Sequence, residues 1–253
     1  MQSPYYSRAG REKDIRKAII KDVTLTYNTR RPFFRAVKKI LKLFIKAPEV
    51  VFYGDEMPRK AIFISNHVGS TGPLKHELYL DYPVYLWGTH EMCLDVKGRW
   101  DYLKDIYYGK KHGYGRLRAF LAAMVALPVT SAFYKGIQVI PTYRDARLMG
   151  TMKTSLNYLK SDYSVLIFPE DSSTGYHDEL IRYFCGFVVL AKLYRRAMKE
   201  DVPIVNMYFS KSTNRLAIDR PMYISEFEGK TDDEIAEIFK NRANDMGRAL
   251  AEP

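Results

Sequence analysis

A chain of 253 residues with 47% hydrophobic and 27% charged side chains has the composition of a globular protein that can bury a sizeable core, which excludes disorder as the default. Forty Lys and Arg against 29 Asp and Glu give a net charge of +11, which predicts attraction to an anionic partner: nucleic acid, a phospholipid surface, or an acidic carrier or phosphorylated substrate. The sequence has no apolar run long enough to span a membrane and no signal-peptide core at its start.

The first predicted element is a basic amphipathic helix over residues 32–46, after a polar segment over residues 1–31. Pro32 occupies its first turn, aromatic and aliphatic side chains recur at helical spacing, and Lys and Arg fill the other face. Such a helix is typical of proteins that lie on anionic membranes, where each basic residue contributes about 1 kcal/mol. The alternative is an ordinary surface helix docked on the core. We expect residues 1–57 to form a membrane-surface segment and residues 58–253 to form an α/β domain.

Two short apolar strands are predicted to end in polar residues. Residues 61–64 lead into Asn66, His67 and a turn rich in Gly, Ser and Thr, and residues 165–168 lead into Pro169 and Glu170. Ligands of α/β sheets bind beyond the carboxyl ends of the strands, so His67 is a candidate functional residue. A structural histidine bonded to a nearby carbonyl is the alternative.

The rest of the chain alternates between helices and strands, which predicts a single α/β domain with a mostly parallel twisted sheet flanked by helices. The apolar run 120–128 is too short to cross a bilayer and is broken by its proline, so we expect a core helix or a re-entrant surface element there. Region 89–118 is expected to be a helical and looped excursion whose basic cluster is solvated or faces a phosphate. The remaining predictions are strands at 84–88, 137–140, 202–209 and 215–224, the last as edge strands, and helices at 149–160, 183–198 and 232–250, the last with Thr231 as N-cap.

Strands that end in Asn-His and in Phe-Pro-Glu resemble the PlsC-like glycerolipid acyltransferases, which include the 1-acylglycerol-3-phosphate acyltransferases. The resemblance implies that His67 is the general base. The aspartate that orients this base in the family is replaced by Gly72. Another carboxylate, with Glu77, Asp81, Glu91 and Asp171 as candidates, would have to reach His67, or the protein is a slow or noncatalytic relative.

Besides the Asn-His motif, three further segments of the sequence resemble sequence blocks of this family. Gly136, the strand 137–140 and Arg144 resemble the phosphate-binding block, with Arg147 as a second candidate and a solvent-exposed arginine as the alternative interpretation. The Phe-Pro-Glu-Gly block appears here as Phe168, Pro169, Glu170 and Asp171, followed by hydroxyl residues from Ser172 on. Residues 202–205 resemble the fourth block, an apolar strand with a proline. By hypothesis, Asp171 would be the carboxylate that compensates for Gly72, and Glu170 would bind the polar head of the acceptor or order the arginine.

The resemblance implies transfer of a fatty acyl group from acyl-CoA or acyl carrier protein to a lysophospholipid such as 1-acylglycerol 3-phosphate, in phospholipid biosynthesis. The site residues would be His67 and Asp171 for catalysis, and Asn66, Arg144, Glu170, Ser172 and Gly136 for substrate binding. No metal or bound cofactor is implied.

The two cysteines bear on where the protein is found in the cell. Cys93 and Cys185 match no metal spacing and are expected to be reduced thiols, which suits a peripheral protein on the cytoplasmic face of the membrane. The alternative function is a catalytically weak or inactive acyltransferase-like protein that binds lipid. Nucleic acid is not an expected partner, since no zinc knuckle, helix-turn-helix or aromatic platform pattern occurs.

Overall fold

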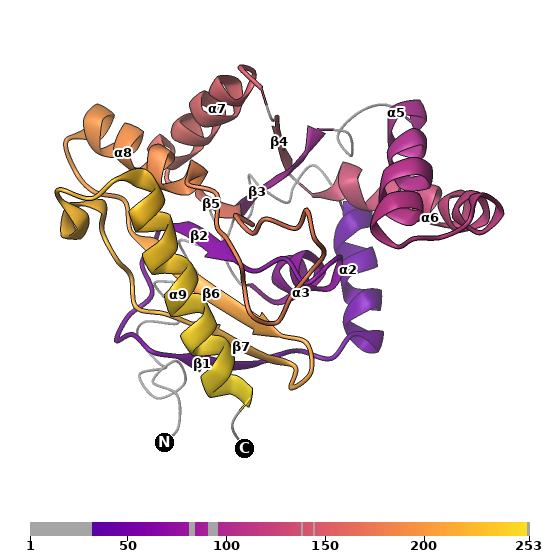
Figure 1. The fold of residues 1–253 in the computed structure, drawn as a ribbon, viewed down its shortest axis with the longest axis horizontal. Coiled ribbons are helices and arrows are strands. Elements are labelled where there is room, and N and C mark those ends of the chain that lie inside the picture. The colour runs from indigo at the N-terminus through magenta and orange to yellow at the C-terminus, as the bar shows by residue number, and fades with distance from the viewer. Residues whose placement is uncertain (1–31, 81–83, 91–95, 138, 144, 252–253) are drawn as a thin grey trace. The chain divides into compact units, whose positions relative to one another are not determined.

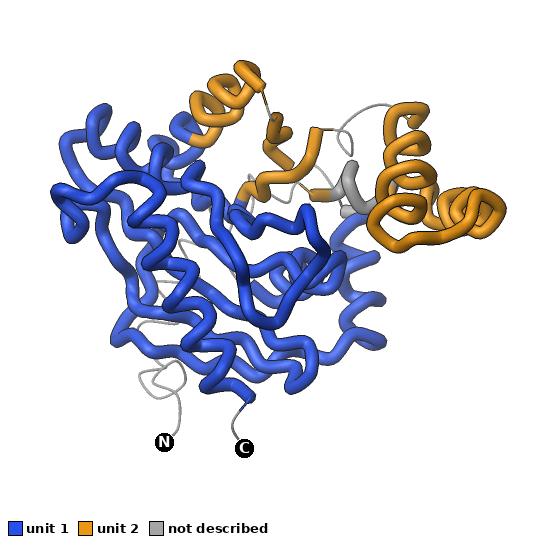
Figure 2. Tube along the Cα trace, viewed as in Figure 1, with its two compact units in different colours: residues 1–84, 156–253 blue, residues 85–155 orange. Residues whose placement is uncertain are grey.

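The computed structural model describes residues 32–80, 84–90, 96–137, 139–143 and 145–251. The chain divides into two compact units (Figure 2): unit 1 comprises residues 1–84 and 156–253, and unit 2 comprises residues 85–155. The boundary expected after residue 57 stays a prediction.

Within its described residues, unit 1 has five strands (Figure 1), in the order β1-β7-β6-β2-β5. Strand β2 is parallel to both of its neighbours, β5 and β6, whereas β7 is antiparallel to β6 and parallel to β1. Every residue of β2 and β5 is buried, as continuous apolar strands are when both faces of the sheet are covered. The predicted α/β class with a mostly parallel sheet flanked by helices is therefore confirmed. The strands are β1 (Glu49–Phe52), β2 (Ile62–Ser65), β5 (Ser164–Ile167), β6 (Ile204–Ser210) and β7 (Arg215–Ile218).

The prediction of one or two edge strands over residues 215–224, around Pro221, is wrong about the edge. Strand β7 lies between β6 and β1 and is not an edge, because the sequence does not predict β1. After Pro221, Met222 forms an isolated antiparallel bridge with Ile204 of β6, and the chain then forms a 3-10 helix, η2 (Ile224–Phe227).

The helices of unit 1 cover this sheet and supply much of its core. The largest fully buried side chains include Phe63 of β2 and Tyr194, Phe187 and Phe239 of the two long helices. Thr231 caps the last helix as predicted, since its hydroxyl accepts the Glu234 N–H at 3.2 Å while its own N–H donates to the Glu234 carboxylate at 2.7 Å. The helices are α2 (Pro32–Phe44), α3 (Thr71–Tyr79), α8 (Gly186–Met198) and α9 (Asp232–Ala251).

Helix α2 does not have the single apolar face that its sequence predicts. Phe34 is buried, and Lys38 also turns inward, donating to the carboxylate of Glu77 on α3 at 2.6 Å. In contrast, Leu43 and Phe44 are 81% and 82% exposed. The helix is thus docked on unit 1 and still presents apolar side chains to its surroundings.

Unit 2 contains a pair of parallel strands and a group of helices. Helix α6 continues through Pro128, so the prediction that this proline breaks the apolar run is wrong; the Thr130 hydroxyl in the next turn donates to the carbonyls of residues 126 and 127. Because α6 ends only at Gly136, the strand predicted at 137–140 is found two residues later. The elements are β3 (Val84–Thr89), α5 (Val96–Asp101), the π-helix η1 (Tyr102–Lys111), α6 (Arg116–Gly136), β4 (Val139–Thr142) and α7 (Leu148–Lys160), whose last residues belong to unit 1.

No helix among the described residues combines the length and the apolar character needed to cross a bilayer.

Candidate functional site

His67 lies just beyond the carboxyl end of β2, where its sequence position predicts it. The chain turns sharply after it, through Val68 with a φ of 46° and Gly69 with a φ of 62°. A β-branched residue rarely adopts this left-handed conformation, so Val68 marks local backbone strain of the kind found at functional turns. The side chain of His67 is half-buried, and its Nδ1 atom is buried.

Asn66 fixes the turn that carries His67. Its side-chain amide donates to the carbonyl of Phe209 at 3.0 Å, and its side-chain oxygen accepts the Phe209 N–H at 2.8 Å. The residue is 1% exposed. Both polar groups of Asn66 thus hold the end of β2 to the end of β6, which is a positioning role; contact between Asn66 and substrate stays a prediction.

Glu170 comes from the end of β5 and reaches the same place. Its carboxylate accepts the backbone N–H of His67 at 2.7 Å. Burial raises the pKa of Glu170, although the backbone N–H groups of His67 and His177 favour its ionised form. Glu170 and the turn that carries His67 meet because β2 and β5 are parallel neighbours in the sheet.

Backbone bonds hold the Glu170 segment in place. The Asp171 N–H donates to the carbonyl of Arg182 at 3.0 Å, and the Phe184 N–H donates to the carbonyl of Pro169 at 2.8 Å. These bonds occupy residues 182–184, which explains why α8 begins at Gly186 and not at residue 183 as predicted.

Two aromatic rings flank the imidazole of His67. Phe168 meets it edge to face with centroids 5.1 Å apart, and Tyr176 stacks on it at 5.3 Å and 18°. Stacking of this kind limits rotation of the imidazole. Tyr176 was not predicted from the sequence, because it lies six residues beyond Glu170 in an irregular loop.

A second histidine, His76, lies beneath this site and was also missed. It is on the buried face of α3, with Nε2 2.9 Å from the hydroxyl of Ser65 and its ring 5.8 Å from that of Phe168. Burial lowers its pKa to about 4, so the ring is neutral at physiological pH. The available signal was helical spacing, since Gly72 and His76 are four residues apart on one face of α3 and both are buried.

Gly72 packs directly against the backbone of the turn. A β-carbon at this position would overlap the carbonyl oxygen of His67 and lie 3.1 Å from its carbonyl carbon. This backbone therefore has no room for the aspartate that the acyltransferase motif carries here.

The structure describes two of the four carboxylates that the sequence offered as partners of His67. One oxygen of Asp171 accepts the N–H of Ser173 at 3.0 Å, in the loop that follows Glu170. Glu77 is buried and ion-paired with Lys38. Asp81 and Glu91 lie outside the described residues. Contact between Asp171 and the imidazole stays a prediction, as does substrate binding by its neighbour Ser172, which is partly exposed.

The predicted phosphate-binding block falls in unit 2. Arg144 lies outside the described residues, and Gly136 is the last residue of α6. The second candidate, Arg147, forms a bidentate pair with Asp145, whose pKa this hydrogen bonding lowers to about 2. The guanidinium of Arg147 also lies over the ring of Tyr143, with its central carbon 4.4 Å from the centroid.

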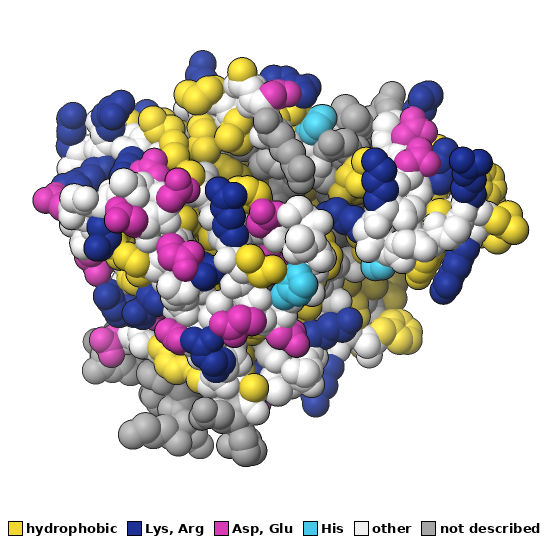
Figure 3. Space-filling model, viewed as in Figure 1, with side chains coloured by type: hydrophobic (Ala, Val, Ile, Leu, Met, Phe, Trp, Pro, Cys, Tyr) yellow, Lys and Arg dark blue, Asp and Glu magenta, His cyan; other side chains and the backbone are white. Residues whose placement is uncertain are grey.

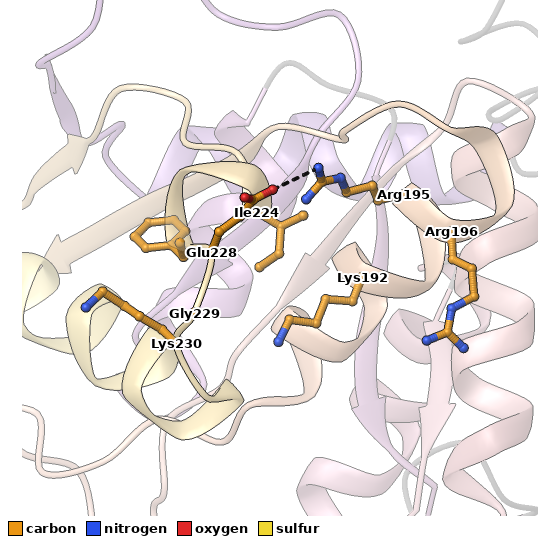
Figure 4. Close-up of a pocket in the computed structure, with 8 residues that line it drawn as sticks. Lys192, Arg195, Arg196, Ile224, Glu228, Gly229 and Lys230 are labelled. Carbon is orange, nitrogen blue, oxygen red and sulfur yellow. Dashed lines mark hydrogen bonds and ion pairs between the residues drawn. The ribbon is translucent and has the colours of Figure 1, made fainter.

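A separate pocket of about 300 Å³ opens between α8 and the segment after η2 (Figure 4). Arg195 in this pocket pairs with Glu228 at 3.3 Å, and Lys192 pairs with Asp232. Its basic character is thus partly neutralised. The lining residues are Lys192, Arg195, Arg196, Ile224, Phe227, Glu228, Gly229 and Lys230.

Among known proteins, the chain has a likeness to a solved structure. No protein-family model and no curated protein matches the sequence. Among solved structures, the chain is similar to the crystal structure of the 1-acyl-sn-glycerophosphate (LPA) acyltransferase PlsC from Thermotoga maritima, with a TM-score of 0.50 and 10% sequence identity over 98% of this chain and 88% of that one. At this identity the likeness shows a shared fold.

Proposed function

We propose that this protein transfers a fatty acyl group from acyl-CoA or acyl carrier protein to the free hydroxyl of a lysophospholipid such as 1-acylglycerol 3-phosphate. The observation that carries the proposal is the hydrogen bond of 2.7 Å from the His67 backbone N–H to the Glu170 carboxylate. This bond joins the segments that follow two adjacent parallel strands, β2 and β5. The fold shared with an LPA acyltransferase supports the same reaction.

The reaction requires a base, and His67 supplies it. Its imidazole takes the proton of the acceptor hydroxyl while the hydroxyl oxygen attacks the carbonyl carbon of the thioester. The tetrahedral intermediate collapses with cleavage of the carbon–sulfur bond, and the imidazolium returns the proton to the departing thiolate. Glu170 fixes the His67 backbone throughout, and Arg144 is proposed to hold the acceptor phosphate by bidentate hydrogen bonds.

The acceptor is a lipid, so the enzyme has to work at a membrane surface. Helix α2 suits this task, because Ile40, Leu43 and Phe44 are exposed beside the exposed Lys39 and Lys42. We propose peripheral binding to anionic phospholipid on the cytoplasmic face.

The experiment that tests the proposal is an assay of purified protein with lysophosphatidate and either acyl-CoA or acylated carrier protein. Phosphatidate should form with at least one donor, and His67→Ala should abolish its formation. His112→Ala is the matched control, since His112 is exposed in unit 2, and it should retain activity. Equal product from the His67→Ala and native proteins would overturn the proposed role of the imidazole.

The second candidate function is lipid binding without turnover, and the steric exclusion of an aspartate at Gly72 favours it. A histidine base that loses its carboxylate partner can be slower by about four orders of magnitude. Saturable binding of lysophosphatidate with no product from either donor would assign this function.

A further inference from the structure

Helix α6 exposes an apolar stripe along one side. Leu117 and Val125 are 74% and 70% exposed, and the members of the stripe follow one another at intervals of three, one, three, one and three residues. This spacing places them on a single face of an α-helix. The α6 stripe consists of Leu117, Phe120, Leu121, Met124, Val125 and Pro128.

The core of unit 2 is built from a different side of the same helix. Ala119 and Ala123 are buried, and Ala123 packs with Leu103 of η1. Ala126 and Leu127 pack against this cluster together with the aromatic residues of α5 and η1. The unit therefore has its apolar core without the stripe, and a soluble surface rarely exposes so many contiguous large apolar side chains unless they meet a partner.

Basic side chains lie at the N-terminal end of the stripe. Lys110 and Lys111 end η1, Arg116 and Arg118 begin α6, and all four are exposed. Helix α6 contains no Asp or Glu. In Figure 3 the surface over α6 shows yellow hydrophobic side chains with dark-blue basic ones next to them. Apolar side chains flanked by cations match the interface of an anionic bilayer, where acyl chains meet charged head groups.

We infer that α6 docks on an anionic phospholipid surface, with its stripe inserted among the acyl chains and the four basic residues among the head groups. The helix would lie in the plane of the interface, because its other side, at Ala123, packs against Leu103 of η1. This surface belongs to unit 2, whereas α2 belongs to unit 1. The inference stands whether or not the protein transfers acyl groups.

Trp100 offers a natural probe of this insertion. The chain has two tryptophans, Trp87 and Trp100, and Trp100 lies edge to face with Phe120 of the stripe, with centroids 5.2 Å apart. The substitution Trp87→Phe leaves Trp100 as the only tryptophan. Vesicles whose acyl chains carry bromine quench a tryptophan only at close range, so the signal reports on α6 even if α2 also binds the membrane.

The full-length Trp87→Phe protein is mixed with brominated vesicles of phosphatidylcholine, with and without phosphatidylglycerol. We expect Trp100 to be quenched and its emission to shift to the blue with the anionic vesicles, and to change little with phosphatidylcholine alone. Adding Leu117→Ser and Val125→Ser should weaken the vesicle affinity seen by Trp100 about tenfold or more. The matched control adds Met149→Ser and Ile181→Ser, which are 66% and 59% exposed outside the stripe, and should bind as the parent does.

Two results would overturn the inference. One is co-sedimentation of the protein with anionic vesicles while Trp100 stays unquenched, because binding would then occur elsewhere. The other is concentration-dependent self-association that the Leu117 and Val125 substitutions abolish, without quenching by lipid, because the stripe would then be an interface between copies of this chain. Circular dichroism of every variant shows whether it is folded, so a loss of quenching can be attributed to the stripe.

Discussion

The carbonyl oxygen of His67 occupies the space that a side chain at Gly72 would need. A β-carbon there would also lie 3.3 Å from the carbonyl oxygen of Asn66. The glycine is therefore a requirement of this turn, and the departure from the acyltransferase motif is a steric feature of the fold and not only the loss of a charge.

The substitution Gly72→Asp tests this conclusion. Placing a β-carbon against a backbone carbonyl should lower the free energy of unfolding by about 2 kcal/mol, and turnover should not rise. Gly72→Ala isolates the effect of size and should destabilise the protein to a similar degree. Chemical denaturation and the acyl-transfer assay provide both measurements. A stable Gly72→Asp protein that is more active than the native protein would contradict the steric argument.

Asp171 is the proposed replacement for the missing carboxylate. If it orients the imidazole of His67 in the substrate complex, Asp171→Ala and Asp171→Gly should each lower turnover about a hundredfold or more. Asp171→Asn keeps an acceptor for the Ser173 N–H and removes the charge, so it should be as slow while remaining as stable as the native protein. Undiminished activity in the Ala and Gly variants would remove Asp171 from the mechanism.

Two substitutions of Glu170 should differ in their effect on stability and agree in their effect on acyl transfer. Because burial raises its pKa, its favourable contribution to folding is largest below the unfolded pKa and declines as pH rises through the folded pKa. Glu170→Gln removes the ionisation and keeps an acceptor for the His67 N–H, so the free energy of unfolding at pH 8 should be no lower than that of the native protein. Glu170→Ala leaves that N–H without its acceptor and should cost about 2 kcal/mol. Acyl transfer should fall in both variants. Equal stability of the two variants would contradict the importance of this hydrogen bond.

His76 should make the fold sensitive to acid. Its pKa is lowered from 6.5 to about 4, so the unfolded chain takes up a proton first as the pH falls. The stabilising contribution is complete above about pH 6.5 and declines down to about pH 4, by about 3 kcal/mol in total. Urea denaturation of the native protein and of His76→Gln across this range measures the difference, because other groups titrate equally in both. Parallel curves for the two proteins would contradict the assignment.

The strands that end at the candidate site could be predicted from the sequence because their signal is local. Residues 61–64 and 165–168 are continuous apolar runs bounded by polar residues, and the structure places them at Ile62–Ser65 and Ser164–Ile167. The position of His67 at a strand end then made it a candidate functional residue. Helix α9 was equally accessible, since its capping residue Thr231 and acidic first turn are local signals.

The features that escaped prediction depend on distant partners. Strand β1 has only four residues and none of them is fully buried, so the sequence gives little indication that it pairs with β7. Lys38 was assigned to the outer face of α2 because it is charged, but it turns inward to the buried Glu77, 39 residues away. His76 is buried against Ser65 because α3 packs against β2, and the sequence alone does not show this packing.

The bonds between Asn66 and Phe209 also have a consequence for the making of the protein. They join residues 143 positions apart, so the turn that carries the imidazole obtains its support only when β6 has been synthesised. A nascent chain that has not yet left the ribosome as far as residue 209 has no formed site. The candidate site can therefore form only late in translation, although His67 itself is synthesised early.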